Sequence, residues 1–413
     1  MLIYNNNEPY VEGLAIKDII SSYATPAYVY SQEKIKNNYL ELSNALRSEI
    51  FYAVKANSNL AIIKLINSLG AGTDVVSIGE MKRALKAGVS PKKIIFEGVG
   101  KSNSEILFAI QNNIRLINIE SIDEINRINQ ISKSNNIEVR IGIRFNPNID
   151  GEMLNEISTG KKTDKFGVSI DDAPFLIDLI KKNNNLKLIG ISCHIGSQIF
   201  NINIFKKIFK VMKDAAKEFN NNDIEIKHLD LGGGFGVQYQ SSQPKLNLED
   251  LSKLIVSFFH DMPYSISFEP GRYIVANAGI LITEIITKKS NGGVNYLITD
   301  AGMNTLIRPS LYGANHEIDA LNKSSKKNIR YTIAGPICES TDIFTKNIEL
   351  PEQEVGDFLI IKDVGAYGAV MASDYNSRGL PNEILVNGSS LAAIHQSEKI
   401  DDIIDKDIIP SWL

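Results

Sequence analysis

A lysine at the end of an apolar run is the first residue of chemical interest. In the stretch FYAVKANSN, residues Phe51 to Val54 form a β-prone run typical of a buried strand, and Lys55 follows directly. A lysine in this place can close an ion pair or extend its ammonium group into solvent. In a desolvated site it can instead lose its proton and form a Schiff base with a carbonyl compound. The stretch alone leaves both interpretations open.

Three later segments place further reactive residue types after apolar runs. His194 lies in CHIGSQ, Gly232 to Gly234 lie in LGGGFG, and Glu269 begins EPGR. Consecutive glycines let the backbone approach a ligand closely, and their amides can bind a phosphate. A Schiff-base lysine, a phosphate site and an acid beside a ring nitrogen are what pyridoxal phosphate requires. The alternatives are a tight turn for the glycines and an ion pair between Glu269 and Arg272.

The last third of the chain contains a second group of candidates. Arg308 and Tyr312 lie in MNTLIRPSLYGANH, where the intervening proline makes a continuous helix doubtful. Arginine suits bidentate recognition of a carboxylate. In GPICESTD, Cys338 is a candidate proton donor and Glu339 a candidate partner for a substrate ammonium group, although an isolated cysteine is usually a small buried hydrophobe. Tyr367, in DVGAYG, is a candidate phosphate or substrate contact.

The elements that position the first group alternate between short β-branched runs and longer segments of helical period, which is typical of βα units. The expected strands are Phe51 to Lys55, Thr73 to Val76, Lys93 to Glu97, Ile114 to Ile119, Glu138 to Phe145, Leu186 to His194, Ile226 to Leu231 and Tyr264 to Glu269. Eight strands that each read as buried on both faces favour a (β/α)₈ TIM-type barrel over an open doubly wound sheet. Active sites of such barrels lie at the carboxyl ends of the strands, where Lys55, His194, the glycines and Glu269 are expected.

After Arg272 the pattern changes to strand-like runs between turn residues, without long helices. The sequence therefore predicts an α/β protein of two domains. The barrel is expected to cover residues 25–270 and to bind the cofactor. A second, mostly antiparallel β domain is expected to comprise residues 271–413 together with residues 1–24.

The composition excludes several classes of protein. The chain has 413 residues, 43% of them hydrophobic, and a net charge of −4 with both signs interspersed, which argues against a nucleic-acid or membrane partner. Its two cysteines form no disulfide framework, and the amino-terminal segment lacks the features of a signal peptide, so a cytoplasmic protein is expected. Zinc-binding spacings, a nucleophile elbow and a Walker A motif do not occur, so no metal site is expected.

Several ordered motifs together resemble one family. FYAVKAN, CHIGSQ, LGGGFG, EPGR, MNTLIRPSLYGANH, GPICESTD and DVGAYG are similar in order and spacing to the motifs of the diaminopimelate decarboxylases, which are pyridoxal-phosphate enzymes of the alanine-racemase-like fold. The resemblance runs from about Thr25 to about Asn387. It implies decarboxylation of meso-2,6-diaminopimelate to L-lysine and carbon dioxide, the last step of lysine biosynthesis.

The resemblance implies a role for each candidate. Lys55 would hold the cofactor, His194 would stack on its ring, Gly232 to Gly234 would bind its phosphate, and Glu269 would contact the pyridine nitrogen. Further cofactor contacts are implied for Gly271, Arg272 and Tyr367, and substrate contacts for Arg272, Arg308, Tyr312, Glu339 and Tyr367. Cys338 would be the proton donor, and the Cys-Glu loop would reach the active site of a neighbouring subunit in a homodimer.

Two alternatives remain at this stage. A decarboxylase of ornithine, arginine or carboxynorspermidine would share the cofactor site, but relatives of the ornithine and arginine branch typically have Cys-Asp where this chain has Cys338 and Glu339. A catalytically silent homologue would be expected to lack the lysine or the cysteine, and both residues are present.

Overall fold

The computed structural model describes residues 1–149, 163–240, 242–322 and 327–413. The chain divides into two compact units. The first, which we call the β unit, consists of Met1–Asn37, Gln238–Gln243 and Ile274–Leu413. The second, which we call the barrel unit, consists of Asn38–Val237 and Pro244–Tyr273.

The barrel unit is built on eight parallel strands. These are β5 (Glu49–Ala53), β6 (Gly72–Val75), β7 (Ile94–Phe96), β8 (Leu116–Ile119), β9 (Val139–Asn146), β11 (Leu186–Cys193), β12 (His228–Asp230) and β13 (Ser265–Phe268). They pair in the order β9-β11-β12-β13-β5-β6-β7-β8, and a further pairing of β8 with β9 closes the barrel. The barrel expected from the sequence is therefore confirmed, and each expected strand lies within two residues of an observed one. Closure excludes the open-sheet alternative.

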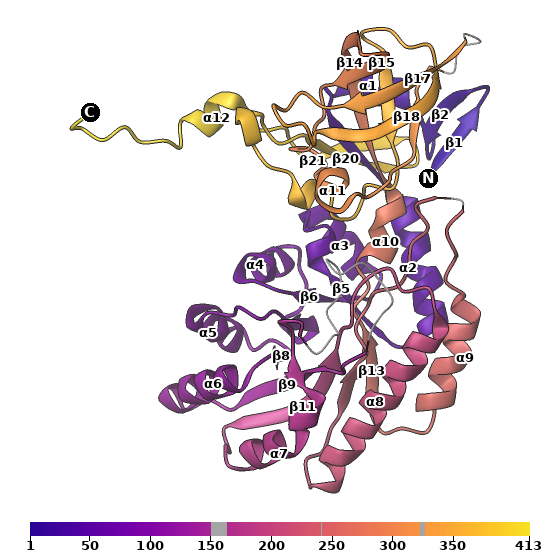
Figure 1. The fold of residues 1–413 in the computed structure, drawn as a ribbon. Coiled ribbons are helices and arrows are strands. Elements are labelled where there is room, and N and C mark those ends of the chain that lie inside the picture. The colour runs from indigo at the N-terminus through magenta and orange to yellow at the C-terminus, as the bar shows by residue number, and fades with distance from the viewer. Residues whose placement is uncertain (150–162, 241, 323–326) are drawn as a thin grey trace. The chain divides into compact units, whose positions relative to one another are not determined.

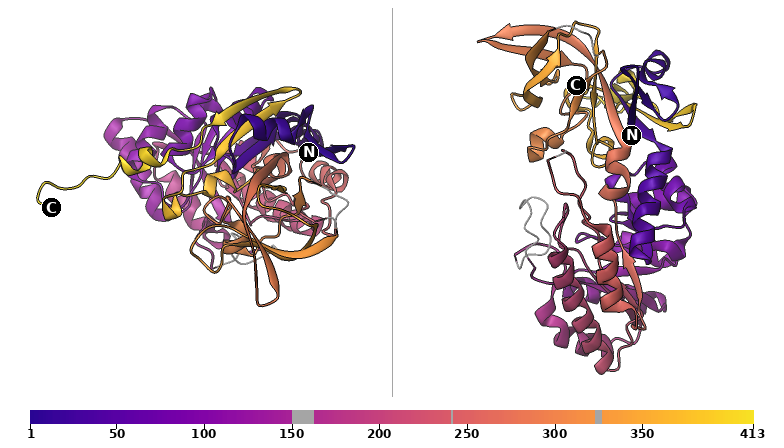
Figure 2. Two further views of the ribbon diagram at one scale, coloured as in Figure 1. Left: turned by 90° about the horizontal axis from the view of Figure 1, so that it is seen from above. Right: turned by 90° about the vertical axis from the view of Figure 1, so that its right-hand side faces the viewer.

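Helices follow most of the barrel strands and lie around the outside of them (Figure 1). They are α2 (Gln32–Leu46), α3 (Leu60–Ser68), α4 (Ile78–Lys86), α5 (Asn103–Gln111), α6 (Ile122–Asn135), α7 (Ala173–Lys181), α8 (Ile202–Asn221), α9 (Leu248–Phe259) and the short α10 (Arg272–Val275). A serine or asparagine at the N-cap accepts a hydrogen bond from an amide of the first turn in six of them: α3, α4, α5, α6, α8 and α9. Figure 2 shows these helices from two further directions.

The β unit contains most of the remaining strands. They are β1 (Leu2–Asn5), β2 (Glu8–Val11), β3 (Leu14–Ala15), β4 (Ala27–Ser31), β14 (Gly279–Asn291), β15 (Val294–Thr299), β16 (Ile318–Ala320), β17 (Asn328–Ala334), β18 (Ile343–Pro351), β19 (Phe358–Ile361), β20 (Asn382–Asn387) and β21 (Ser390–His395). The larger sheet has the order β18-β17-β15-β14-β4-β20-β21, with β19 also paired to β14 and β16. Only β15–β17 and β4–β20 pair in parallel among the described strands of this unit, so the expectation of a mostly antiparallel domain is confirmed.

The amino-terminal boundary differs from the one expected at residue 25. Strand β4 lies in the β unit, between β14 and β20, whereas the expected range would have placed it in the barrel domain. The reason is burial of apolar side chains, because Val29 packs in one core cluster with Ile280, Ile282 and Ile384. The run YVYS is buried along its whole length, which a central strand of a sheet requires.

No helix in the described ranges is long and apolar enough to cross a bilayer.

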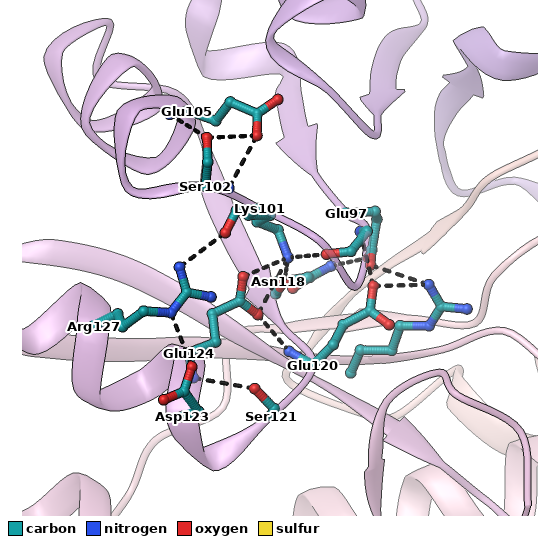
Figure 3. Close-up of polar contacts among 12 residues, drawn as sticks. Glu97, Lys101, Ser102, Glu105, Asn118, Glu120, Ser121, Asp123, Glu124 and Arg127 are labelled. Atoms are coloured by element: carbon teal, nitrogen blue, oxygen red, sulfur yellow. Dashed lines mark hydrogen bonds and ion pairs between the residues drawn. The ribbon is translucent and has the colours of Figure 1, made fainter.

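A buried ion pair between Lys101 and Glu124 links two segments of the barrel unit (Figure 3). The Lys101 side chain is 0% exposed and its Nζ lies 3.1 Å from Oε1 of Glu124, whose side chain is 3% exposed. The ammonium group also donates to the carbonyl oxygens of Gly98 (2.7 Å) and Asn118 (2.6 Å). Glu124 in turn accepts from the backbone N–H of Glu120 at 2.8 Å. These bonds tie the segment after β7 to the segment between β8 and α6.

Replacing Lys101 by methionine should destabilise the protein strongly. The substitution leaves Glu124 buried without its cation, and an uncompensated buried charge costs about 3–5 kcal/mol of unfolding free energy. Urea denaturation of the two proteins measures the loss. The matched control is Lys253→Met, because Lys253 forms a 2.7 Å ion pair with Glu249 on an exposed helix face and should be nearly neutral. Equal urea midpoints for Lys101→Met and Lys253→Met would show that the buried Lys101–Glu124 ion pair does not stabilise the fold.

Candidate active site

Lys55 lies at the carboxyl end of β5, in a short 3-10 turn of residues Val54–Ala56. The Tyr52 hydroxyl donates to the Asn57 carbonyl at 2.9 Å, which fixes this turn against the strand. The Lys55 side chain is 36% exposed, and its Nζ lies 3.5 Å from Oδ2 of the buried Asp74 on β6. Lys55 therefore does form an ion pair, which was one of the two interpretations of the sequence. An amine that is partly exposed at the barrel rim is also placed to react with a carbonyl compound.

Glu269 follows β13 and is buried. Its Oε1 atom has no hydrogen-bond partner among the described residues, while its backbone N–H donates to the Gly232 carbonyl at 2.9 Å. Burial, followed by the negative charges of Asp230, Asp74 and Glu97, raises the pKa of Glu269 well above its usual value, and Lys55 acts in the opposite direction. A cationic group beside Oε1 would restore the ionised form of this carboxyl group.

The glycine loop lies beside the backbone of Glu269. Gly232 and Gly234 have φ values of +69° and +85°, which favour glycine, and a Cβ on Gly233 would lie 2.2 Å from the Glu269 carbonyl oxygen. Two of the three amides already have protein acceptors: Gly232 N–H donates to Asp230 (2.8 Å) and Gly233 N–H donates to Nδ1 of His194 (3.2 Å). The Gly234 amide has no partner among the described residues, so it is the one open to an anion.

His194 follows β11 and contacts the same loop. Because Nδ1 accepts from the Gly233 amide, a neutral His194 carries its proton on Nε2. Burial, then the positive charges of Lys55 and Arg144, hold the pKa of His194 well below its usual value. The side chain is thus an uncharged aromatic ring beside the glycine loop.

Arg272 and Gly271 follow Glu269 in the next turn. The Arg272 Nε donates to the Ser197 hydroxyl at 3.0 Å, and Ser197 lies just after His194. Gly271 is buried, and the Pro270 carbonyl before it accepts from the Ala53 amide at 3.2 Å. The structure therefore brings together the candidates expected at the ends of the first, sixth, seventh and eighth barrel strands.

Sequence reasoning missed a buried charged network that faces these candidates. Arg144 on β9 lies 3.2 Å from Glu120 and 3.6 Å from Glu97, measured from Nη1 to a carboxylate oxygen. Glu97 also accepts from the Asn118 amide group (Figure 3). Burial is the largest cause that raises the pKa of Glu97 to about 7 and the pKa of Asp230 to about 6. A signal was available, because charged residues interrupt or end the apolar strand sequences TDVV, IIFE and IGIRF.

The β unit contains the remaining candidates. Arg308 begins α11 (Arg308–Tyr312), and the expectation of a broken helix is corrected, because the proline occupies the first turn, where its missing N–H costs no hydrogen bond. Arg308 is buried, its Nη1 lies 2.9 Å from Nε2 of His316, and its guanidinium group lies 4.8 Å from the centre of the Tyr239 ring. Tyr312, at the end of α11, is partly exposed.

The Cys-Glu loop and Tyr367 lie elsewhere in this unit. Cys338 is exposed, and its backbone N–H donates to Oδ1 of Asn376 at 3.2 Å. The Glu339 carboxylate accepts from the Tyr375 hydroxyl at 2.7 Å, a partner that the sequence did not indicate. Tyr367 is partly buried and has a φ of +55°, an uncommon conformation for a bulky residue that often marks a functional site.

The residues of the barrel unit fit pyridoxal phosphate. A buried carboxylate oxygen without a partner is suited to a protonated ring nitrogen, and the Gly234 amide, in a loop too tight for a Cβ at Gly233, is suited to a phosphate oxygen. Lys55 supplies the amine and His194 an uncharged ring.

Comparison with known proteins agrees with this fit. Residues 32–276 match the family model described as "Pyridoxal-dependent decarboxylase, pyridoxal binding domain". A diaminopimelate decarboxylase of Aquifex aeolicus is 38% identical over 405 residues, which are 98% of this chain and 96% of that protein. The chain belongs to the diaminopimelate decarboxylases.

Two further members of the family support the same assignment. A diaminopimelate decarboxylase of Helicobacter pylori strain J99 is 41% identical over 94% of this chain and 96% of its own length. The crystal structure of diaminopimelate decarboxylase from M. jannaschii in co-complex with L-lysine superposes with a TM-score of 0.95 at 35% identity, covering 100% of this chain and 99% of that one. Pyridoxal phosphate is accordingly the cofactor of this diaminopimelate decarboxylase family member.

Replacing Gly233 by alanine should weaken cofactor binding. The added Cβ would overlap the Glu269 carbonyl oxygen and push the glycine loop away from the Glu269 backbone. Such overpacking costs about 1–3 kcal/mol, so we expect the dissociation constant of pyridoxal phosphate to rise about tenfold. Absorbance titration of the apoprotein measures it. Gly100→Ala is the matched control, because a Cβ there meets nothing within 4 Å. Unchanged affinity in Gly233→Ala would show that this loop does not bind the cofactor.

Proposed function

We propose that this chain catalyses the decarboxylation of meso-2,6-diaminopimelate to L-lysine and carbon dioxide, the last step of lysine biosynthesis, in the cytoplasm. The observation that carries the proposal is the buried Glu269 carboxylate without a partner at Oε1, in the same barrel end as Lys55, His194 and the glycine loop. Family membership along nearly the whole chain supports the substrate, as does the L-lysine named in the M. jannaschii complex.

The barrel unit would bind and activate the cofactor. When bound, pyridoxal phosphate supplies an electron sink for the bond that breaks as carbon dioxide leaves. Lys55 would hold the cofactor through its amine. The ionised Glu269 carboxylate would accept a hydrogen bond from the ring nitrogen and so keep that nitrogen protonated. Its Oε1 atom has no other donor among the described residues. His194 would pack its uncharged ring on the cofactor, and the glycine loop, Gly271 and Arg272 would orient the cofactor.

The β unit would recognise the second amino-acid end of the substrate. Arg308 would bind the distal carboxylate, and Glu339 would bind the distal ammonium group. Tyr312 and Tyr367 add hydroxyl contacts to substrate, and Tyr367 also contacts the cofactor. Cys338 donates a proton to the carbon from which carbon dioxide has left.

A buried arginine distinguishes this substrate from its rivals. Ornithine and arginine have no distal carboxylate, so either one would leave the Arg308 guanidinium group without its ligand. A site that is built to bind a polar group rejects analogues that lack it, because the buried partner is then unpaired. The burial of Arg308 therefore favours diaminopimelate over these substrates.

The exposure of the Cys-Glu loop supports a homodimer with shared active sites. Cys338 is exposed, although a proton donor must work in a site closed to bulk water. We propose that a second copy of the chain covers this loop, so that Cys338 and Glu339 of one subunit act on the cofactor held by Lys55 of the other.

Carbon dioxide release from a panel of substrates tests the reaction. We expect release and L-lysine formation from meso-diaminopimelate, with rates about 10⁴-fold lower for ornithine, arginine and carboxynorspermidine because they lack the distal carboxylate that Arg308 would bind. Lys55→Ala is the control and should be inactive and lack the absorbance of the lysine-bound cofactor. Efficient turnover of ornithine, or full activity of Lys55→Ala, would refute the proposal.

Subunit mixing tests the shared site. Lys55→Ala and Cys338→Ala are each expected to be inactive, whereas random subunit exchange between them would create one intact site in every mixed dimer and restore roughly a quarter of the wild-type activity. A mixture of Lys55→Ala with Lys55→Ala/Cys338→Ala is the control and should stay inactive. If subunits exchange, as seen by differently tagged chains, and activity does not return, each site belongs to a single chain.

A further inference from the structure

Arg308 lies in a cluster with two other side chains that the proposed reaction does not use. We call Arg308, His316 and Tyr239 the arginine cluster. The Arg308 Nη1 lies 2.9 Å from His316 Nε2, and the guanidinium carbon lies 4.8 Å from the Tyr239 ring centre. The rings of Tyr239 and His316 meet edge to face, with centroids 5.5 Å apart and planes at 87°. Arg308, His316 and Tyr239 are each less than 9% exposed.

The hydrogen bonds of His316 fix its tautomer. Its Nδ1 lies 2.8 Å from the Lys362 carbonyl oxygen, which can only accept, so Nδ1 carries a proton. The Arg308 guanidinium group can only donate, so Nε2 accepts and carries none. His316 is therefore a neutral ring that is held by the backbone on one side and holds Arg308 on the other.

The chain is folded so that His316 can reach Arg308. After α11, Gly313 takes a φ of +61° and its N–H donates to the Pro309 carbonyl at 3.0 Å, which reverses the chain. The Ala314 amide then donates to the Arg308 carbonyl at 3.3 Å. His316 lies just before β16, and Lys362 lies just after β19, with which β16 pairs. The cluster is thereby anchored to a sheet rather than to a loop.

Tyr239 comes from a different part of the sequence. It lies in Gln238–Gln243, the short segment that belongs to the β unit although it follows the glycine loop. The Gln243 side-chain oxygen accepts from the Tyr239 amide at 2.8 Å and from the Gln240 amide at 3.3 Å, which ties the backbone at Tyr239 to Gln243. The Tyr239 ring thus offers its face to a guanidinium group that is shielded from water, where a cation–π contact is strongest.

We propose that His316 and Tyr239 are positioning residues that hold Arg308 in the orientation that binds the distal carboxylate of the substrate. Arginine has several rotatable bonds, and a site that must recognise a carboxylate through two parallel hydrogen bonds needs the guanidinium plane fixed. His316 fixes one nitrogen of that plane, and Tyr239 fixes its tilt. The inference rests on the proposed role of Arg308 as the carboxylate ligand.

Two ligands that differ only in the carboxylate test the inference. L-lysine keeps the distal carboxylate, whereas 1,5-diaminopentane is the same diamine without it. In the holoenzyme, His316→Ala should weaken inhibition by L-lysine about tenfold and raise the KM for meso-diaminopimelate by a similar factor, because a hydrogen bond to a charged group is lost. The kcat and the inhibition constant of 1,5-diaminopentane should stay within about twofold of wild type. Equal losses for both diamines would overturn the inference.

Conservative replacements separate the two hydrogen bonds of His316. Glutamine reaches the place of Nε2 and can accept from Arg308, whereas asparagine reaches only the place of Nδ1. His316→Gln should therefore recover most of the affinity for L-lysine, and His316→Asn should resemble His316→Ala. Tyr239→Phe keeps the ring and should bind L-lysine more tightly than Tyr239→Leu. Identical behaviour of the glutamine and asparagine variants would contradict the proposed contact with Arg308.

A double-mutant comparison distinguishes this inference from the proposed function. Arg308→Met should weaken L-lysine binding, and adding His316→Ala to it should cause no further loss, because His316 acts through Arg308. If Arg308→Met binds L-lysine normally, the proposed role of Arg308 is wrong. If Arg308→Met weakens binding and His316→Ala does not, or if their losses multiply, the inference about His316 is wrong. His260→Ala, at an exposed histidine of the barrel unit, is the control and should bind like wild type.

Discussion

Buried negative charge at the carboxyl end of the barrel is the constraint on which the site depends. Asp74, Glu97, Asp230 and Glu269 lie on or directly after four different strands, and all four are buried. Burial and mutual repulsion raise the pKa of Glu97, Asp230 and Glu269, so the carboxylates cannot all be ionised without cations. Lys55 supplies a positive charge beside Asp74, and Arg144 supplies one beside Glu97. A protonated pyridine ring at Glu269 would add a third, which makes the cofactor part of the electrostatic balance of the barrel as well as of the reaction.

The two units are proposed to bind different molecules, the cofactor in the barrel unit and the distal end of the substrate in the β unit. In the barrel unit, the proposed cofactor contacts come from strand ends and from a loop that cannot accept a side chain at Gly233. In the β unit, Arg308 and Glu339 are proposed to select one substrate among several similar amino acids. Each of these two residues has a second side chain beside it, His316 for Arg308 and Tyr375 for Glu339. Selectivity of this kind depends on a fixed orientation more than on the number of charges.

Much of this could be predicted from the sequence, for reasons that particular residues show. Most of the barrel strands lie in short apolar runs with β-branched residues, so composition and spacing locate them. Lys55 and Glu269 each stand out as a charge at the end of such a run. Strand β4 was assigned to the wrong unit because its partners, β14 and β20, are far away in sequence, and pairing over such distances leaves no local pattern. His316 and Tyr239 were missed for the same reason, since only the turn at Gly313 and the segment Gln238–Gln243 bring them to Arg308. Arg144 and Asp230 were missed although they lie on strands that the sequence located.

The position of β4 also has a consequence for how the chain is made. The chain passes between the two units four times, so neither unit is a continuous stretch of the polypeptide. Strand β4 emerges from the ribosome early, whereas its neighbours β14 and β20 begin only at Gly279 and Asn382. The barrel can close as soon as β13 has been synthesised, while β4, whose residues are all buried in the folded protein, has no strand partners for most of translation. Vectorial synthesis thus sets an order in which the strands of the barrel unit are all synthesised before the β unit can be completed.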